Sequence, residues 1–197
     1  MQRRGEVTKL VKAICELESL SPYSQSRNFE REIETLARET KDDREHRCWK
    51  NRMHVTEDGN VFIPPMAFKN GLSETAKYIS MQIPGKGKST YTKHFEAGVM
   101  VVVPVDIGIK AETVKGEWLY VPADGRRGGP KRVWRCFPYI PKWKGTVEFI
   151  ILDDAVTEEV FTKHLAEFGS FIGVGRFRPR NNGYYGRFRV NGVEWAQ

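Results

Sequence analysis

Arginine, glycine and aromatic residues are interleaved over residues 171–190, and this stretch contains no Asp or Glu. The arginine side chain carries a planar fork of donors that matches phosphate oxygens, and aromatic rings offer faces on which bases stack. Glycine lets the backbone turn sharply and lets another chain approach closely. We therefore predict that a nucleic-acid backbone lies along a loop over residues 173–186. The alternative is a basic, solvated hairpin with glycines at its turn. The candidate contacts are Arg176, Arg178, Arg180, Tyr184 and Arg187.

A second group of basic residues lies in a predicted loop over residues 82–94, with Lys86, Lys88, Tyr91 and Lys93 as candidate contacts to RNA. The run Gly-Lys-Gly-Lys-Ser-Thr within it is similar to a P-loop in composition. Its spacing differs, because a Walker A motif has four residues between its first glycine and the Gly-Lys pair, and it follows a strand. We therefore exclude nucleotide hydrolysis and interpret the run as a flexible loop that touches phosphates.

Side chains that could cleave RNA without a metal ion are present, but they form no motif. Such cleavage needs a general base near a 2′-hydroxyl group, usually a histidine, and the candidates are His46, His54 and His94. His46, Cys48 and His54 lie close in sequence without a CxxC or HExxH pattern, so we expect neither a metal site nor a cofactor. A non-catalytic RNA-binding subunit is favoured over an enzyme, and the question of catalysis stays open.

Positive charge is concentrated in parts of the chain. The 197 residues carry a net charge of +7, with 40% hydrophobic and 29% charged residues and a pI near 9.3. Residues 126–144 hold seven Lys and Arg and no acidic residue. Clustered charge of one sign favours an anionic partner such as nucleic acid. This pattern adds Arg126 and Arg127 to the candidate contacts, and Arg27 is a further one.

The cysteine pattern and the hydropathy bear on the compartment. Three cysteines, odd in number and widely spaced, indicate free thiols in a reducing environment. No apolar run is long enough to span a bilayer, and the first residues lack the apolar core of a signal peptide. We therefore expect a cytoplasmic protein with no membrane partner.

The first half of the chain is predicted to hold a strand, a helix and a charged insertion. Residues 7–17 alternate as a strand with one buried face. Residues 65–80 form an amphipathic helix that begins at a proline and carries Lys69 in its first turns. Between them, residues 28–41 have the narrow apolar stripe of a helix, and residues 42–52 are expected to be a charged loop. Asp58-Gly59-Asn60 predicts a hairpin turn before the long helix.

The second half is predicted to complete the sheet. Residues 98–109 are apolar and β-branched, which predicts a central strand buried on both faces, and residues 112–129 are expected to project as a hairpin. A second helix is capped by Thr157 and ended by Gly169. Further strands are expected at residues 132–139, at residues 146–152 and in the last residues of the chain.

Without its insertions, this order is β-α-β-β-α-β, the ferredoxin-like (RRM-like) arrangement of an α+β protein. We expect one domain over residues 1–197, with insertions at about 28–52, 82–96 and 111–130. Two helices then cover one face of an antiparallel sheet. The open face, or a groove at its edge, remains for a ligand.

Three stretches resemble the RAMP superfamily of CRISPR effector complexes, most of all its crRNA-binding backbone subunits. They are the first strand with Leu-Ser-Pro-Tyr-Ser at 20–24, Asp-Gly-Asn-Val-Phe-Ile-Pro-Pro-Met-Ala-Phe-Lys-Asn-Gly-Leu at 58–72, and Ile-Gly-Val-Gly-Arg-Phe-Arg-Pro-Arg-Asn-Asn-Gly-Tyr-Tyr-Gly-Arg-Phe at 172–188. The resemblance implies a subunit that binds crRNA, stacks on copies of itself and contacts other CRISPR effector subunits. It also implies that Lys69 approaches the phosphates and that the 173–186 loop holds the RNA backbone. The loops at 85–94 and 118–129 would kink the strand or grip a neighbour.

Two other functions stay open. The superfamily also contains crRNA-processing enzymes and subunits that cut a target, which implies an endoribonuclease as one alternative. Some backbone subunits cut the target with an Asp in the loop after the first strand, and the resemblance implies Asp42 or Asp43 for that role. A sequence-independent single-stranded DNA-binding protein would use the same groove physics, since contacts to the 2′-hydroxyl group are what distinguish RNA from DNA. For the favoured RNA-binding function, the expected stacking surfaces for splayed bases are Trp118, Tyr120, Tyr91 or Tyr184.

Overall fold

A four-stranded antiparallel sheet with the strand order β3-β7-β1-β8 lies at the centre of the fold. The structure is a computed structural model that describes residues 10–125 and 128–196. Helices α2 and α4 make the two connections over the sheet, so the core runs β1-α2-β3-β7-α4-β8. This order confirms the predicted ferredoxin-like α+β arrangement. The strands are β1 (Val11–Ser19), β3 (Val99–Met100), β7 (Lys144–Ile151) and β8 (Phe188–Ala196).

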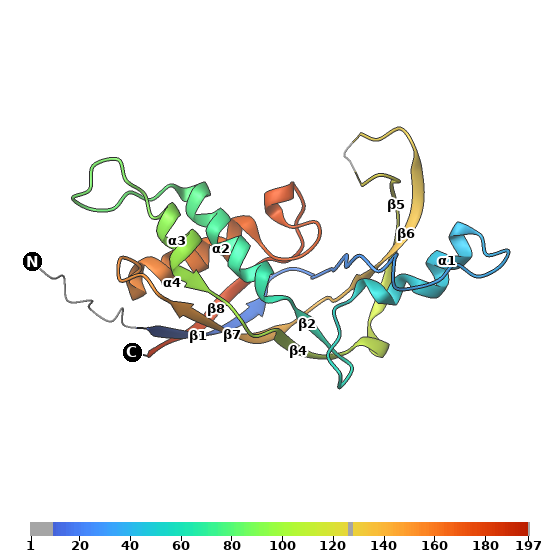
Figure 1. Ribbon diagram of the computed structural model, residues 1–197, viewed down its shortest axis with the longest axis horizontal. Coiled ribbons are helices and arrows are strands. Elements are labelled where there is room, and N and C mark those ends of the chain that lie inside the picture. Colours follow the sequence, from blue (N-terminus) through green and yellow to red (C-terminus); the bar gives the residue numbers. More distant parts are fainter. Residues whose placement is uncertain (1–9, 126–127, 197) are drawn as a thin grey trace, which may run out of the picture.

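Three helices lie together on one side of this sheet (Figure 1): α2 (Pro65–Ile79), α3 (Thr92–Gly98) and α4 (Glu158–Glu167). α2 begins at Pro65, whose fixed φ suits the first helical position. α4 begins after Thr157, whose side chain accepts a hydrogen bond from the Val160 backbone N at 3.4 Å. Both predicted helices are therefore confirmed, whereas α3 begins within a segment that was expected to be a loop.

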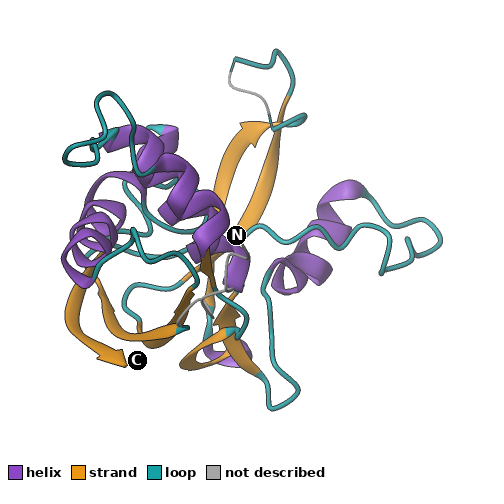
Figure 2. Ribbon diagram, turned by 60° about the vertical axis from the view of Figure 1, so that its left-hand side comes forward, coloured by secondary structure: helices purple, strands orange, loops and turns teal. Residues whose placement is uncertain are grey.

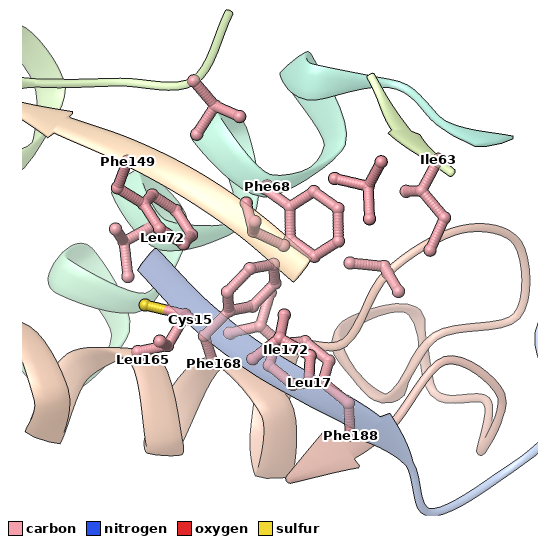
Figure 3. Close-up of a cluster of buried hydrophobic side chains, with 14 of the residues drawn as sticks. Cys15, Leu17, Ile63, Phe68, Leu72, Phe149, Leu165, Phe168, Ile172 and Phe188 are labelled. Atoms are coloured by element: carbon pink, nitrogen blue, oxygen red, sulfur yellow. The ribbon is translucent and has the colours of Figure 1, made fainter. Parts of the chain in front are cut away.

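The core lies between these helices and the sheet. The alternation in β1 buries Cys15 and Leu17 on the helix side, as the sequence predicted. Figure 3 shows these two side chains in one cluster with Phe68 of α2 and with Phe168 and Phe188. The rings of Phe168 and Phe188 meet edge to face, with centroids 5.0 Å apart. The core therefore fixes α2 and the end of α4 against β1 and β8.

Gly169 does not end α4, contrary to the prediction. The helix continues into a π-helical turn at Phe168–Ile172, and the chain leaves this turn at Gly173, where φ is 70°. Gly169 is needed for packing instead, because a Cβ atom there would lie 2.1 Å from the carbonyl oxygen of Phe188. The extra turn places Phe171 on the surface.

The predicted central strand at residues 98–109 is wrong. Only Val99–Met100 joins the main sheet, at its edge, and the chain then leaves it through exposed Val102 and Val103. Pro104 has no N–H group to donate to a ladder. The rest of the run forms β4 (Val105–Lys110), which pairs with β2 (Asn60–Ile63) in a separate two-stranded sheet. A continuous apolar run does not reveal that one chain segment serves two sheets.

Strands β5 (Lys115–Pro122) and β6 (Arg132–Tyr139) form a projecting two-stranded arm (Figure 2). A hairpin was predicted at residues 112–129, but residues 132–139 were expected to join the main sheet. They pair with β5 instead, and the register sets Tyr120 opposite Trp134. The predicted hairpin includes Arg126 and Arg127, which lie outside the described residues.

The helix predicted at residues 28–41 is also wrong, as is the loop predicted after it. The helix here is α1 (Lys41–Cys48), followed by a 3₁₀ helix at Trp49–Arg52. Thr40 and Asp43 form a capping box, which starts the helix at Lys41. Earlier, the Asn28 side chain accepts a hydrogen bond from the Glu30 backbone N, which favours a turn. Local polar contacts therefore outweigh a weak apolar stripe.

A buried carboxylate joins α1 to the base of the β5–β6 arm. Glu45 is 3% exposed and accepts hydrogen bonds from Arg52 Nη2 at 2.7 Å, from Arg135 Nη1 at 2.8 Å and from the Cys136 backbone N at 2.8 Å. Burial alone would raise the pKa of Glu45, but these hydrogen bonds outweigh it and lower the pKa. Glu45 is therefore charged at neutral pH and anchors the arm.

Candidate nucleic-acid interface

Two rows of side chains on α2 form the floor of a surface groove, which we call the α2 groove. Residues four apart lie on one helix face, so Lys69, Ser73 and Lys77 make one row and Asn70, Glu74 and Tyr78 make the other. Together with Glu96 and Arg180 they line a volume of about 590 Å³. The sequence placed Lys69 here, and the helical period places the other five.

The first row of the α2 groove faces α3. The Lys69 ammonium donates hydrogen bonds to the backbone carbonyls of Phe95 at 3.1 Å and Glu96 at 2.8 Å, and to Ser73 Oγ at 2.8 Å. Burial lowers the pKa of this ammonium. Lys77 pairs with the Glu96 carboxylate at 2.6 Å. Lys69 thus lines the groove, but its donors tie α2 to the end of α3.

The second row faces the glycine–arginine loop, the name we give to residues 173–187. Both Arg178 and Arg180 bind the Glu74 carboxylate, at 2.9 Å each. In Figure 1 this loop lies between α2 and the β5–β6 arm. The walls of the α2 groove therefore come from two segments about a hundred residues apart in sequence, as the separation of 106 between Arg180 and Glu74 shows.

The ion pairs leave the α2 groove positively charged. Lys77 pairs with the Glu96 carboxylate, Arg178 and Arg180 both pair with the Glu74 carboxylate, and Lys69 binds backbone carbonyls and Ser73 instead. These four cations and two carboxylates give a net charge of +2. Cations held in place by carboxylates and present in excess over them form a prearranged site for a polyanion. The groove can therefore accept phosphate groups without a large rearrangement of its side chains.

The glycines of the glycine–arginine loop serve contacts within the chain. Gly175 has a φ of 78°, and a Cβ atom on it would lie 2.4 Å from the Tyr23 ring and 2.5 Å from the Ser24 carbonyl oxygen. The neighbouring Arg176 backbone N donates to that same carbonyl at 2.9 Å. The close approach that we expected glycine to allow for RNA is made here by the protein's own segment after β1.

Arg176 is partly buried and packs on aromatic rings, whereas Arg178 and Arg180 bind the Glu74 carboxylate. The Arg176 guanidinium carbon is 3.2 Å from the centroid of the Phe137 ring in β6 and 3.7 Å from that of Phe177. Burial lowers the pKa of Arg176 to about 10. Its Nη1 atom is buried and has no hydrogen-bond partner among the described residues. Arg176 therefore holds the loop against the arm.

The outer side of the glycine–arginine loop carries Tyr184 and Arg187. Tyr184 is 62% exposed, and the exposed Arg187 side chain makes no ion pair within the part of the chain that the structure describes. The neighbouring Tyr185 is buried and donates its hydroxyl hydrogen bond to Glu117 of β5. Alternate residues thus anchor the loop and face solvent.

The remaining predicted contacts are dispersed. Lys86 and Lys88 lie in the exposed loop between α2 and α3, and Lys93 is exposed on α3. Arg27 is engaged by Glu32 and by the Asn51 carbonyl oxygen. The Tyr91 ring is 6% exposed and packs against His94 and His164, so it offers no face to a base.

The open face of the main sheet does not have the character of an RNA surface. Glu16, Glu18, Glu148 and Glu194 share this face, and Lys12 pairs with Glu148 at 2.9 Å while Arg189 pairs with Glu18 at 2.6 Å. Hydrogen bonds from Arg189, Asn191 and Lys144 lower the pKa of Glu18 to about 2. The described residues that point to this face from β1, β7 and β8 include no aromatic ring, which RRM-type stacking requires.

The catalytic candidates do not meet in one site, because Asp43 and His46 both lie on α1, whereas His94 lies on α3. His94 Nδ1 is 2.7 Å from Asp153 Oδ2, whereas Asp43 caps α1 and the His46 ring lies 4.1 Å from that of Trp118. Figures 1 and 2 both place α3 and α1 at opposite ends of the molecule. In residues 10–125 and 128–196 no group of three His, Cys, Asp or Glu side chains could hold a metal ion.

Aromatic side chains that the sequence did not single out also reach the surface. Trp134 lies beside Tyr120 on one face of the arm, with ring centroids 5.4 Å apart, and both rings are about half exposed. Tyr78 and Phe171 form a second exposed pair at the α2 groove. The helical period after Glu74 could have pointed to Tyr78, but only the fold places Phe171 beside it.

No helix in the described residues is both long and apolar enough to cross a membrane. No protein-family model matches the sequence, and no curated protein does. The fold, in contrast, is similar to that in the crystal structure of Cmr6 from Pyrococcus furiosus. The TM-score is 0.50 at 13% identity, over 92% of this chain and 99% of Cmr6.

A second similar structure is a chain in the cryo-EM structure of the Type III-B Cmr-beta bound to cognate target RNA. The TM-score is 0.51 at 9% identity, over 96% of this chain and 61% of that one. At such identities the likeness is one of fold. The chain therefore shares its ferredoxin-like fold with Cmr6 and with a chain of the Type III-B Cmr-beta structure.

Proposed function

We propose that this protein is an RNA-binding subunit of a CRISPR-type ribonucleoprotein, and that it binds crRNA or another single-stranded RNA along the α2 groove. The observation that carries the proposal is the net charge of +2 in a groove bordered by Arg178 and Arg180. Phosphate contacts supply most of the affinity of such sites. The fold shared with Cmr6 and with a subunit of an RNA-bound Cmr-beta complex supports RNA over other polyanions.

Copies of this chain or other effector subunits are its proposed protein partners. The β5–β6 arm supports this part of the proposal, because it projects from the core and carries the exposed rings of Trp118, Tyr120 and Trp134. Exposed aromatic clusters of this kind mark contacts with other molecules. Light scattering with and without a long single-stranded RNA tests it, and a mass that stays that of one chain on such an RNA contradicts self-assembly.

An endoribonuclease is the second candidate function. The hydrogen bond between His94 Nδ1 and Asp153 Oδ2 supports it, because a carboxylate that orients an imidazole leaves the other nitrogen to act as a base. The proposal favours binding, since Asp43 and His46 lie on α1, at the far end of the molecule from His94. Defined cleavage products from labelled RNA that disappear in His94→Ala would reverse this preference.

A matched pair of lysine variants tests RNA binding by the α2 groove. Lys77 and Lys12 each form one ion pair with a glutamate at the surface, but only Lys77 lies in the groove. By fluorescence anisotropy at about 0.1 M salt, we expect Lys77→Ala to weaken binding of a labelled single-stranded RNA by about 5-fold and to lower the salt slope by about 0.7. Lys12→Ala is expected to change neither.

Equal effects of the two substitutions would place the RNA elsewhere, and wild-type binding that is insensitive to salt would refute the proposal. Competition with DNA of the same sequence, in the same assay, distinguishes RNA from DNA as the ligand, because the two strands differ in the 2′-hydroxyl group. Preference for the DNA strand would favour a single-stranded DNA-binding protein.

A further inference from the structure

One end of the α2 groove carries an exposed pair of aromatic rings. Tyr78 is 55% exposed and Phe171 is 50% exposed, and their rings are stacked with centroids 6.1 Å apart and planes inclined by 28°. Neither ring contributes to the core, and neither was among the residues expected to contact RNA. Single exposed apolar side chains are ordinary, but here two rings share one site with cations.

Both rings are held in place by regular structure. Tyr78 is in the last turn of α2, and Phe171 is in the π-helical turn Phe168–Ile172. The first and last residues of this turn, Phe168 and Ile172, are fully buried. The turn thus fixes its own backbone in the core and directs Phe171 outward. A ring on a rigid element loses little conformational entropy when a ligand stacks on it.

Cations lie next to this aromatic pair. Lys77 precedes Tyr78, and both line the α2 groove together with Arg180. Lys77 is held by the Glu96 carboxylate, and Arg180 by the Glu74 carboxylate, which it shares with Arg178. Ring faces beside excess positive charge match a nucleotide, whose base stacks while its phosphate pairs with the cations.

We propose that Tyr78 and Phe171 form a stacking platform for one base of the bound RNA strand, with the phosphate of that nucleotide held by Lys77 and Arg180. This inference rests on the proposed RNA-binding function and assigns to it a site for a single nucleotide. A ring face accepts any base, so the platform binds nucleotides without regard to sequence. A protein partner is the less favoured occupant, because two cations border the rings.

The test compares two strands in the same anisotropy assay. One is a labelled single-stranded RNA, and the other is a ribose-phosphate strand of the same length without bases. We expect the double variant Tyr78→Ala, Phe171→Ala to bind the RNA about 5- to 100-fold more weakly, the range that follows from the loss of one stacked base. Its affinity for the abasic strand is expected to stay at the wild-type value, since the phosphate contacts remain.

Two controls accompany the double variant. Tyr78→Phe keeps the ring and is expected to bind RNA as the wild type does. Met66→Ala removes a side chain of similar exposure, 56%, from the other end of α2 and is expected to have no effect. Because the substituted side chains are exposed, thermal unfolding checks that each variant is folded. Photo-cross-linking with thiouridine RNA is expected to modify the peptides that contain Tyr78 or Phe171.

Each other result overturns the inference. Unchanged RNA affinity in the double variant, or an equal loss on both strands, means that no base stacks there. Unchanged RNA affinity with loss of self-association would assign the rings to a contact between protein chains. If the wild type binds neither strand, the RNA-binding function itself fails, and this outcome is distinct from a failure of the platform alone.

Discussion

Three arginines that alternate in one loop, at positions 176, 178 and 180, are expected to respond in two different ways to substitution. Arg178 and Arg180 bind the surface carboxylate of Glu74, whereas Arg176 lies between the rings of Phe137 and Phe177. Replacing the outer two with alanine should weaken RNA binding and leave the fold intact. Replacing Arg176 should destabilise the fold and leave the phosphate contacts in place.

The magnitude for the outer pair follows from the charges in the α2 groove. Removing Arg178 and Arg180 lowers its net charge from +2 to 0, because Glu74 stays without a partner. Each phosphate contact contributes about 0.7 to the salt slope for a single strand, so the slope should fall by about 1.4 and the affinity by about 25-fold at 0.1 M salt. Loss of these surface ion pairs costs only about 0–1 kcal/mol of stability each.

The magnitude for Arg176 follows from its packing. Arg176→Ala removes two cation–π contacts and the apolar stem between two rings, and should lower the free energy of unfolding by about 1–3 kcal/mol. Arg176→Met retains much of the volume and removes a buried N–H group without a partner, so it should be less destabilising than alanine.

Urea unfolding and salt-dependent anisotropy test this reasoning. Both are measured on the wild type, the double variant without Arg178 and Arg180, Arg176→Ala and Arg176→Met. The separation of the two effects is the critical result. If Arg176→Ala weakened RNA binding as much as the double variant did while its unfolding free energy stayed at the wild-type value, then Arg176 would be a phosphate ligand in solution and its packing between the two rings would be wrong. If the double variant retained full affinity, the α2 groove would not be the binding site.

Three further predictions concern single side chains. Glu74→Gln raises the net charge of the α2 groove from +2 to +3, so RNA affinity measured by anisotropy should rise by about 5-fold at 0.1 M salt; a fall would mean that Glu74 positions the arginines. Because its folded pKa is lowered, Glu45 contributes stability that is present above its unfolded pKa of about 4.3 and is lost as pH falls through the folded value. In urea unfolding, Glu45→Gln should therefore abolish this part of the loss of stability in acid. Glu45→Ala should lower the free energy of unfolding by about 3–5 kcal/mol at neutral pH, because two arginines lose their buried partner. Wild-type stability in both variants would contradict the anchoring role. Burial raises the pKa of the Cys15 thiol to about 12 and that of Cys136 to about 11, so neither should react with a thiol reagent until the protein unfolds, and rapid labelling of the native protein would show an open core.

Local patterns were sufficient for the main elements of the fold. The alternation of β1, the proline at the start of α2 and the Thr157 cap of α4 are properties of neighbouring residues, so the sequence alone determined them and, through their order, the ferredoxin-like arrangement. Where two local signals competed, the prediction failed. The stripe at residues 28–41 was weaker than the capping box of Thr40 and Asp43, which no apolar period reveals.

The candidate site was predictable as a stretch of chain but not as a surface. The sequence by itself determined that a loop at residues 173–186 would be basic, glycine-rich and aromatic. Only the tertiary structure decided which partners its arginines meet. Arg176 packs on the ring of Phe137, which belongs to β6, far away in the sequence. The same holds for the pair of Tyr78 and Phe171, which meet because the end of α4 packs beside α2. The physical reason is that charge and hydropathy belong to each residue, whereas burial and pairing depend on what the rest of the chain brings next to it.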